Sequence, residues 1–279
     1  MSSKTLSSTP KHNRTGFKEQ LAFGVRELLL GLSSVNLAAC GLLFKKGRKP
    51  AVDFVSYTYK LYSGYGLQGP FHDLPWRSDC LLPRIRASKA FHEIDFTRSP
   101  ELLFPFPTAL SVSPLELAIL ALLVRNLKPK RVIEFGTAEG RTTVNLALYL
   151  PPDGEVVTID LPPRSGASSA GHLGSGQAVE GRIKQLLGDV TQFDWTPYER
   201  SAEFVFCDAC DLYEGFAKET AAAFRVVQPG GIVLWHDYGF VRDRTKFLNE
   251  LGRKLPVKHI EGTTVAYLRI ESSEFLTKL

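Results

Sequence analysis

The sequence from Val132 to Thr143 reads VIEFGTAEGRTT, and this stretch decides the fold. A short apolar run at 131–135 leads into a turn that contains Gly136 and Gly140, and a helical pattern follows at 141–150. An apolar run, a glycine turn and a helical pattern in this order predict a strand, a tight turn and a helix.

The residues just before this unit predict a buried helix. Ser113-Pro114-Leu115-Glu116 is a capping box with proline at the first helical position, and the apolar sequence LELAILALLVRNL continues from it. Lys128-Pro129 is expected to end this helix, because proline cannot continue a helix and restricts the residue before it.

The same alternation of strands and helices continues to the C-terminal end. Further strands are expected at 155–160, 183–187, 203–207, 231–236 and 264–269, and helices around 213–226 and 241–255. A strand at 257–260 would pair with the last one as a hairpin at the edge of the sheet. Together these elements predict an α/β fold: a Rossmann-like, doubly wound, mostly parallel seven-stranded sheet with helices on both faces.

An N-terminal helical and irregular extension precedes this domain. We divide the chain into a basic arm with an apolar helix at 1–50, an aromatic and proline-rich cap or dimerisation segment at 51–112, the main domain at 113–270 and a tail at 271–279. The arm carries nine Lys and Arg against two Glu, so the formal charge of +5 leaves the rest of the chain at about −2. No nucleic-acid partner is therefore expected.

The apolar run at 28–44 contains seventeen uncharged residues and is followed at once by four basic ones. This pattern suits peripheral membrane contact through residues 28–49. Seventeen residues is the lower limit for a span, so a buried helix that packs on the main domain or on a second subunit of a homodimer is the favoured alternative.

Four cysteines in 279 residues are too few for a disulfide scaffold and indicate a reducing compartment. The pair Cys207-x-x-Cys210 has no second pair to complete a zinc site. With no convincing signal peptide, we expect a cytoplasmic protein, with membrane association through the apolar run as an open alternative.

The carboxyl ends of the predicted strands carry the residues suited to a ligand. The turn spacing is Gly136-x-x-x-Gly140, which differs from the Gly-x-Gly-x-x-Gly of dinucleotide enzymes. Glu134 lies on the strand itself, where its charge would disfavour a pyrophosphate and favour a cationic group. Asp160 ends the next strand, where a carboxylate can accept both hydroxyls of a ribose. Asp189 follows the strand after that and could accept from an adenine amino group.

Five segments, IEFGTAEGRTT, VVTID, LLGD, FCDACDLYEG at 206–215 and PGGIVLWHDY at 229–238, resemble a known family. They are similar to the class I S-adenosylmethionine-dependent methyltransferases. Within that family they resemble the small-molecule O-methyltransferase-like group that includes relatives of cephalosporin hydroxylase and sugar O-methyltransferases. The resemblance covers residues 113–269.

The resemblance implies S-adenosylmethionine as cofactor and a small-molecule or glycan hydroxyl as methyl acceptor. It assigns cofactor binding to Glu134, Gly136, Thr137, Ala138, Gly140, Asp160, Asp189 and Asp208, and it places Asp208, His236 and Asp237 against the acceptor as catalytic residues.

Two mechanisms for removing the acceptor's proton stay open. His236 is a candidate base because the pKa of histidine lies near neutral pH, although a strand-end histidine satisfied by hydrogen bonds is as good an interpretation. Alternatively, Asp208, His236 and Asp237 could hold a divalent metal such as magnesium or manganese, as metal-dependent relatives do. The imidazole suits manganese better than magnesium.

One position departs from the family pattern: Asp211 stands where relatives often have histidine. This change, together with the basic arm, motivates an alternative function as a non-catalytic nucleoside-binding protein or a membrane-tethered scaffold with a methyltransferase-like fold. A nicotinamide-dependent dehydrogenase is disfavoured by the glycine spacing.

Overall fold

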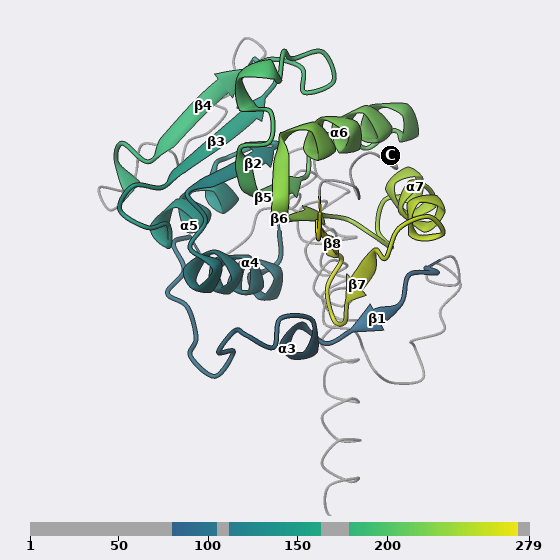
Figure 1. The fold of residues 1–279 in the computed structure, drawn as a ribbon, viewed down its shortest axis with the longest axis horizontal. Helices are drawn as coiled ribbons and strands as arrows, with labels where there is room; N and C mark the ends of the chain where they lie inside the picture. The colour runs from purple at the N-terminus through teal and green to yellow at the C-terminus, as the bar shows by residue number, and fades with distance from the viewer. Residues whose placement is uncertain (1–79, 105–111, 163–178, 273–279) are drawn as a thin grey trace, which may run out of the picture. The chain divides into compact units, whose positions relative to one another are not determined.

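The computed structural model describes residues 80–104, 112–162 and 179–272 (Figure 1). All of them belong to the second of two compact units in the chain. The predictions for the basic arm, the apolar run at 28–44 and most of the aromatic segment lie outside the described residues. Within the described ranges, no helix has the length and hydropathy needed to span a membrane.

The described residues form one eight-stranded sheet in the order β1-β7-β8-β6-β5-β2-β3-β4. The strands are β1 (Arg84–Ile85), β2 (Arg131–Phe135), β3 (Glu155–Asp160), β4 (Ile183–Leu187), β5 (Ala202–Cys207), β6 (Val227–Trp235), β7 (Lys258–Ile260) and β8 (Ala266–Arg269). Only β8 runs antiparallel to its neighbours β6 and β7. The predicted Rossmann-like, mostly parallel sheet is confirmed, and so is the hairpin of its last two strands.

The predicted number of seven strands was one too few. The added strand, β1, has two residues and pairs in parallel with β7, where Arg84 lies opposite His259. Two residues are too short to show an alternating pattern, and the partner strand lies far away in the sequence. The hairpin therefore sits one strand in from the edge of the sheet.

Helices cover both faces of the sheet, as the sequence predicted. They are α3 (Ala87–Ala90), α4 (Pro114–Leu127), α5 (Arg141–Leu148), α6 (Tyr213–Val226) and α7 (Arg242–Gly252), with a 3-10 turn at Thr196–Tyr198. The buried side chains of α4 and α5 share one hydrophobic cluster with one face of the central strands. Those of α6 and α7 share a second cluster with the opposite face (Figure 1). The central strands are therefore apolar on both faces.

Helix α4 begins at the predicted capping box. The Ser113 hydroxyl accepts from the Glu116 amide at 3.3 Å, and the Ser113 amide donates to Glu116 Oε2 at 2.8 Å. The helix ends at Lys128, whose backbone is left-handed with φ of 49°, directly before Pro129. The cap fixes where Glu116 lies, which matters for the site below.

A buried tyrosine connects β1 to the rest of the sheet. The Tyr238 hydroxyl accepts from the Leu82 amide at 2.9 Å and donates to Asn249 Oδ1 at 2.7 Å. The Leu81 amide donates to the same Asn249 oxygen at 3.0 Å. Tyr238 thus links the segment before β1 to helix α7.

We expect Tyr238→Phe to lower the free energy of unfolding by about 1–3 kcal/mol, because it leaves the buried Leu82 amide without its acceptor. Denaturant unfolding followed by circular dichroism measures this change. Tyr149→Phe is the control, since its hydroxyl donates to the exposed Glu101 carbonyl, and it should change stability by less than about 0.5 kcal/mol. Equal losses in the two variants would contradict the linking role of Tyr238.

Candidate functional site

Four parallel strands, β3, β2, β5 and β6, end at one edge of the sheet. The pairing register places Phe135 opposite both Ile159 and Cys207, and Cys207 opposite Trp235. Asp160, the last residue of β3, and the residues that follow the other three strands, Gly136, Asp208 and His236, are therefore neighbours at that end of the sheet. This is the end of a parallel sheet at which α/β proteins bind ligands.

The glycine turn brings two strand ends into close contact. Gly136 has φ of +95°, and a Cβ atom built there would lie 2.5 Å from the carbonyl oxygen of Asp208. The Ala138 amide donates to Asp160 Oδ2 at 2.7 Å, so the turn is joined to the end of β3. Only glycine fits the first position of this turn, and the exposed residues of the turn are Ala138 and Glu139.

Glu134 is a buried carboxylate with one oxygen engaged. Its Oε2 accepts from the hydroxyls of Thr143 and, at 2.7 Å, Thr158. Its Oε1 is buried and has no hydrogen-bond partner among the described residues. Burial raises the pKa of this carboxyl to about 8, against the two threonine hydrogen bonds. The unpaired oxygen can accept a hydrogen bond from a ligand, and a cationic ligand group beside it would favour the ionised carboxylate.

The two other acids predicted to bind the cofactor, Asp160 and Asp189, differ in the hydrogen bonds that they already accept. Asp160 lies at the end of β3 and accepts from the Ala138 and Leu161 amides. Asp189 follows β4, where its two oxygens accept from Thr191 and Gln192 within its own turn. Those bonds lower the pKa of the Asp189 carboxyl. The adenine contact predicted for Asp189 stays a prediction.

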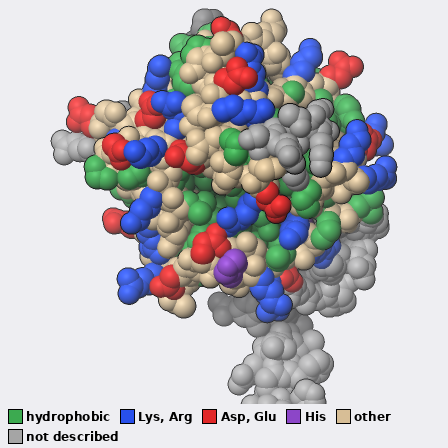
Figure 2. Space-filling model, viewed as in Figure 1, with side chains coloured by type: hydrophobic (Ala, Val, Ile, Leu, Met, Phe, Trp, Pro, Cys, Tyr) green, Lys and Arg blue, Asp and Glu red, His purple; other side chains and the backbone are tan. Residues whose placement is uncertain are grey.

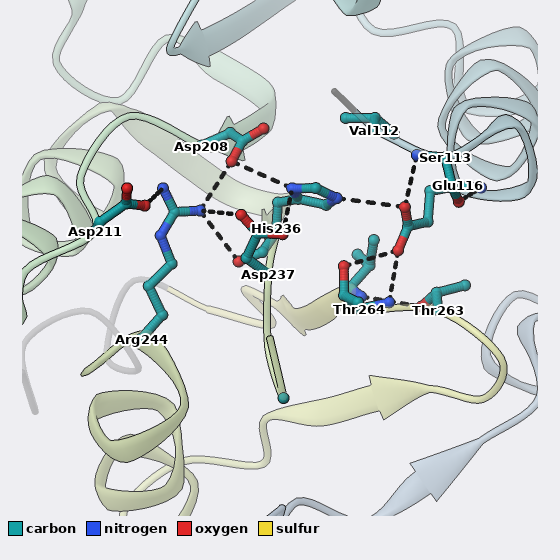
Figure 3. A network of polar contacts seen from close by, with 12 residues as sticks. Val112, Ser113, Glu116, Asp208, Asp211, His236, Asp237, Arg244, Thr263 and Thr264 are labelled. Carbon is teal, nitrogen blue, oxygen red and sulfur yellow. Dashed lines mark hydrogen bonds and ion pairs between the residues drawn. The ribbon is translucent and has the colours of Figure 1, made fainter. Parts of the chain in front are cut away.

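Asp208, His236 and Asp237 meet at the ends of β5 and β6 (Figure 3). His236 Nδ1 lies 3.2 Å from Asp208 Oδ1 and 3.3 Å from Asp237 Oδ1. Its Nε2 lies 3.3 Å from Glu116 Oε2. Burial by itself would lower the pKa of His236, but the carboxylates of Asp237, Asp208 and Glu116 together raise it well above its usual range. His236 is thus a buried cation with a carboxylate opposite each ring nitrogen.

Glu116 belongs to this site, although the sequence indicated only its role in the helix cap. Its Oε1 accepts from the Thr264 amide at 2.6 Å and from the Thr264 hydroxyl at 2.8 Å, and its Oε2 faces both Ser113 and His236. Burial opposes its ionisation, yet His236 and these hydrogen bonds hold the pKa of Glu116 well below its usual value. One carboxylate therefore links α4, the segment before β8 and the end of β6.

Arg244 is the second residue that the sequence did not reveal, because an arginine in the first turn of an amphipathic helix is typical of a solvent-exposed face. Its Nη1 lies 2.8 Å from Asp208 Oδ1 and 3.7 Å from Asp237 Oδ2, and its Nη2 lies 3.1 Å from Asp211 Oδ1. Its Nε donates to the Cys210 carbonyl at 2.8 Å. Asp211, which differs from the family pattern, thus has a structural partner, since this exposed acid pairs with a buried guanidinium.

Three side chains of the cluster carry atoms that could act as ligands of a divalent metal. One ligand atom from each of Asp208, His236 and Asp237 lies within 4.8 Å of the others. However, Arg244 donates to Asp208 Oδ1, so a metal about 2.1 Å from that oxygen would lie within about 5 Å of the guanidinium. The guanidinium already occupies that oxygen as a hydrogen-bond donor, so a dication there would displace this bond and lie beside a fixed positive charge. In this arrangement the site does not fit a metal.

On the face of the described residues that Figure 2 shows, acidic and basic side chains are interspersed, and neither sign forms a continuous patch.

Comparison with known proteins identifies the central part of the chain. Residues 133–238 match the model of a family described as a methyltransferase domain. A caffeoyl-CoA O-methyltransferase of Stellaria longipes is 27% identical over 131 residues, which cover 45% of this chain and 53% of that protein. A catechol O-methyltransferase of Niastella koreensis is 26% identical over 132 residues, covering 45% and 57%. The chain thus spans about half the length of the curated relatives that it matches.

A solved structure supports the same fold. The S-adenosylhomocysteine-bound methyltransferase of Podospora anserina aligns with a TM-score of 0.50 at 20% identity, over 60% of this chain and 83% of that one. The resemblance to the class I methyltransferases that the sequence motifs indicated is confirmed over this domain.

Glu134 yields a pH-dependent prediction. Its carboxyl has a pKa of about 8 in the folded chain and a usual value of 4.5, so the folded state holds its proton more tightly. The stability linked to this proton is complete below pH 4.5 and is lost as the pH rises towards 8. Glu134→Gln removes that loss and should raise the free energy of unfolding at pH 8.5 by on the order of a few kcal/mol.

Thermal unfolding between pH 5 and pH 8.5 measures this effect. The gain in Tm of the Glu134→Gln variant over the native chain should grow with pH. Glu199→Gln, which changes an exposed carboxyl, should show no such trend. Parallel pH profiles for the native chain and the Glu134→Gln variant would mean that Glu134 is ionised in the folded protein.

Proposed function

We propose, from the premise that residues 133–238 form a methyltransferase domain of the class I fold, that the chain transfers a methyl group from S-adenosylmethionine to a hydroxyl of a small molecule. The observation that carries the proposal is the group formed by Gly136, Glu134 and Asp160 at the strand ends, which combines a glycine turn, an unpaired buried carboxylate oxygen and a strand-end acid. Its relatives, caffeoyl-CoA and catechol O-methyltransferases, support oxygen as the acceptor atom.

Different residues would bind different parts of the cofactor. When bound, S-adenosylmethionine supplies an electrophilic methyl group on a sulfonium that becomes a neutral thioether. Glu134 would bind the cationic end through its unpaired oxygen, with the turn at Gly136, Thr137, Ala138 and Gly140 against the ligand. Asp160 would accept from the ribose hydroxyls and Asp189 from the adenine.

The acceptor hydroxyl must be aligned with the methyl group, and a base must accept its proton. The sequence alone suggested His236 or a metal. The His236 side chain is only 1% exposed and has a carboxylate opposite each ring nitrogen, whereas the Asp208 side chain is 18% exposed. We therefore assign the proton to the Asp208 carboxylate, and we assign to His236 and Arg244 the task of holding Asp208.

This choice of proton acceptor favours an acidic hydroxyl. A carboxylate is a weak base, so it suits a phenol or an enol better than a sugar hydroxyl, whose pKa is far higher. The glycan acceptor that the sequence motifs suggested is therefore the second choice. Residues 84–85 of the aromatic segment at 51–112 belong to the sheet as β1, and the rest of that segment stays a proposed cap or dimer contact.

We expect calorimetry to detect one S-adenosylmethionine site per chain. Asp160→Asn should weaken binding about ten-fold or more, because hydrogen bonds to a charged group contribute about 1.5–3 kcal/mol. Asp153→Asn, which changes an exposed acid at the start of β3, is the control and should leave the affinity unchanged. A folded native chain that binds no S-adenosylmethionine would rule out the proposal.

Transfer is tested separately by mass spectrometry with phenolic and sugar acceptors. The proposal expects a gain of one methyl group in the phenols. Binding of the cofactor without transfer to any acceptor of either class would favour the alternative, a non-catalytic nucleoside-binding or scaffold protein.

A further inference from the structure

We propose that Arg244 is the resident cation of the acceptor site, that its guanidinium holds Asp208 and Asp237 where a divalent metal would otherwise do so, and that the chain works without such a metal. This inference rests on the proposed function, because that function assigns a methyl acceptor to the site. The claim that the cluster binds no metal concerns the side chains alone and can be measured without turnover.

The guanidinium is fixed from several sides. Arg244 extends from the first turn of α7 and is 2% exposed at its side chain. Nε donates to the Cys210 carbonyl at 2.8 Å, and Nη1 donates to Asp208 Oδ1 at 2.8 Å and to the His236 carbonyl at 3.3 Å. The ring of Phe216 lies 5.3 Å from its central carbon. A planar group engaged in this way is preorganised and cannot swing aside at low cost.

Both acids that could act as metal ligands face this cation. Asp208 Oδ1 is shared between Arg244 and His236, and Asp237 lies against the same two groups through its two oxygens (Figure 3). The acids therefore share the Arg244 guanidinium and the His236 ring as close neighbours, and a metal would compete with both of them for the same oxygens.

Asp211 completes the outer side of the guanidinium. Its carboxylate lies 3.1 Å from Nη2 and is 72% exposed, so it connects the buried cation to the surface of the site. With Asp208 at the inner end and Asp211 at the outer end, Arg244 spans the loop that follows β5. We assign Arg244 as a positioning residue for Asp208.

The first test uses the full native chain and Mn²⁺, titrated by electron paramagnetic resonance with and without S-adenosylhomocysteine. We expect no Mn²⁺ site that depends on Asp208. One bound ion per chain that disappears in Asp208→Asn would overturn the proposal. Binding that persists in Asp208→Asn lies elsewhere and agrees with a metal-free cluster.

The second test substitutes the arginine. Arg244→Met should open the cluster, so that one Mn²⁺ binds where the native chain binds none, and it should lower kcat more than ten-fold with little change in KM for S-adenosylmethionine. Arg244→Lys, which keeps a positive charge, should recover part of kcat and again exclude Mn²⁺. Arg242→Met, an exposed arginine on the same helix, is the control and should resemble the native chain in both measurements.

The Arg244→Met variant and the native chain together distinguish the possible results. An Arg244→Met chain that folds, binds no Mn²⁺ and keeps its kcat would contradict the proposal. Should that variant fail to fold, the native titration and the effect of a chelator on native turnover decide. Activity lost with chelator and restored by Mg²⁺ would overturn the proposal, whereas an inactive chain that excludes Mn²⁺ would contradict only the proposed function.

Discussion

The ion pair between Asp208 and Arg244 is the interaction on which the geometry of the candidate site depends. It joins the end of β5 to the first turn of α7, and it shares Asp208 Oδ1 with His236 at the end of β6. Removing such charges from water costs several kcal/mol per ion, and only a complete set of partners offsets that cost. Each helix or strand that contributes a partner is therefore held in place by the others.

Glu116 on helix α4 is a further member of this set of charged partners. Its carboxylate closes the helix cap, accepts from Thr264 and faces His236, so the start of α4 has the position that the buried imidazole requires. On the cofactor side, close packing of the backbone has the corresponding role. Gly136 touches the carbonyl of Asp208, which means that the turn for the cofactor and the acid for the acceptor share a contact. The two halves of the candidate site are thus one structural unit.

The sequence predicted the features that depend on neighbours in the chain. The capping box at Ser113, the glycine turn and the apolar strands are local patterns, and they form where expected, except that β6 begins at Val227 and not at the predicted residue 231. The second role of Glu116 depends on His236, which lies 120 residues away, and the role of Arg244 depends on how α7 packs beside α6 near the end of β5. No local pattern reports such contacts. The short strand β1 escaped prediction for the same reason, since its partner is β7.

A crystal structure of the full chain grown with S-adenosylhomocysteine tests whether the cofactor binds at the carboxyl ends of the strands. We expect ligand density there, with the ribose hydroxyls on Asp160 and the thioether beside the turn at Gly136. A ligand bound away from these strand ends, or none at a concentration that saturates other class I methyltransferases, would contradict this expectation.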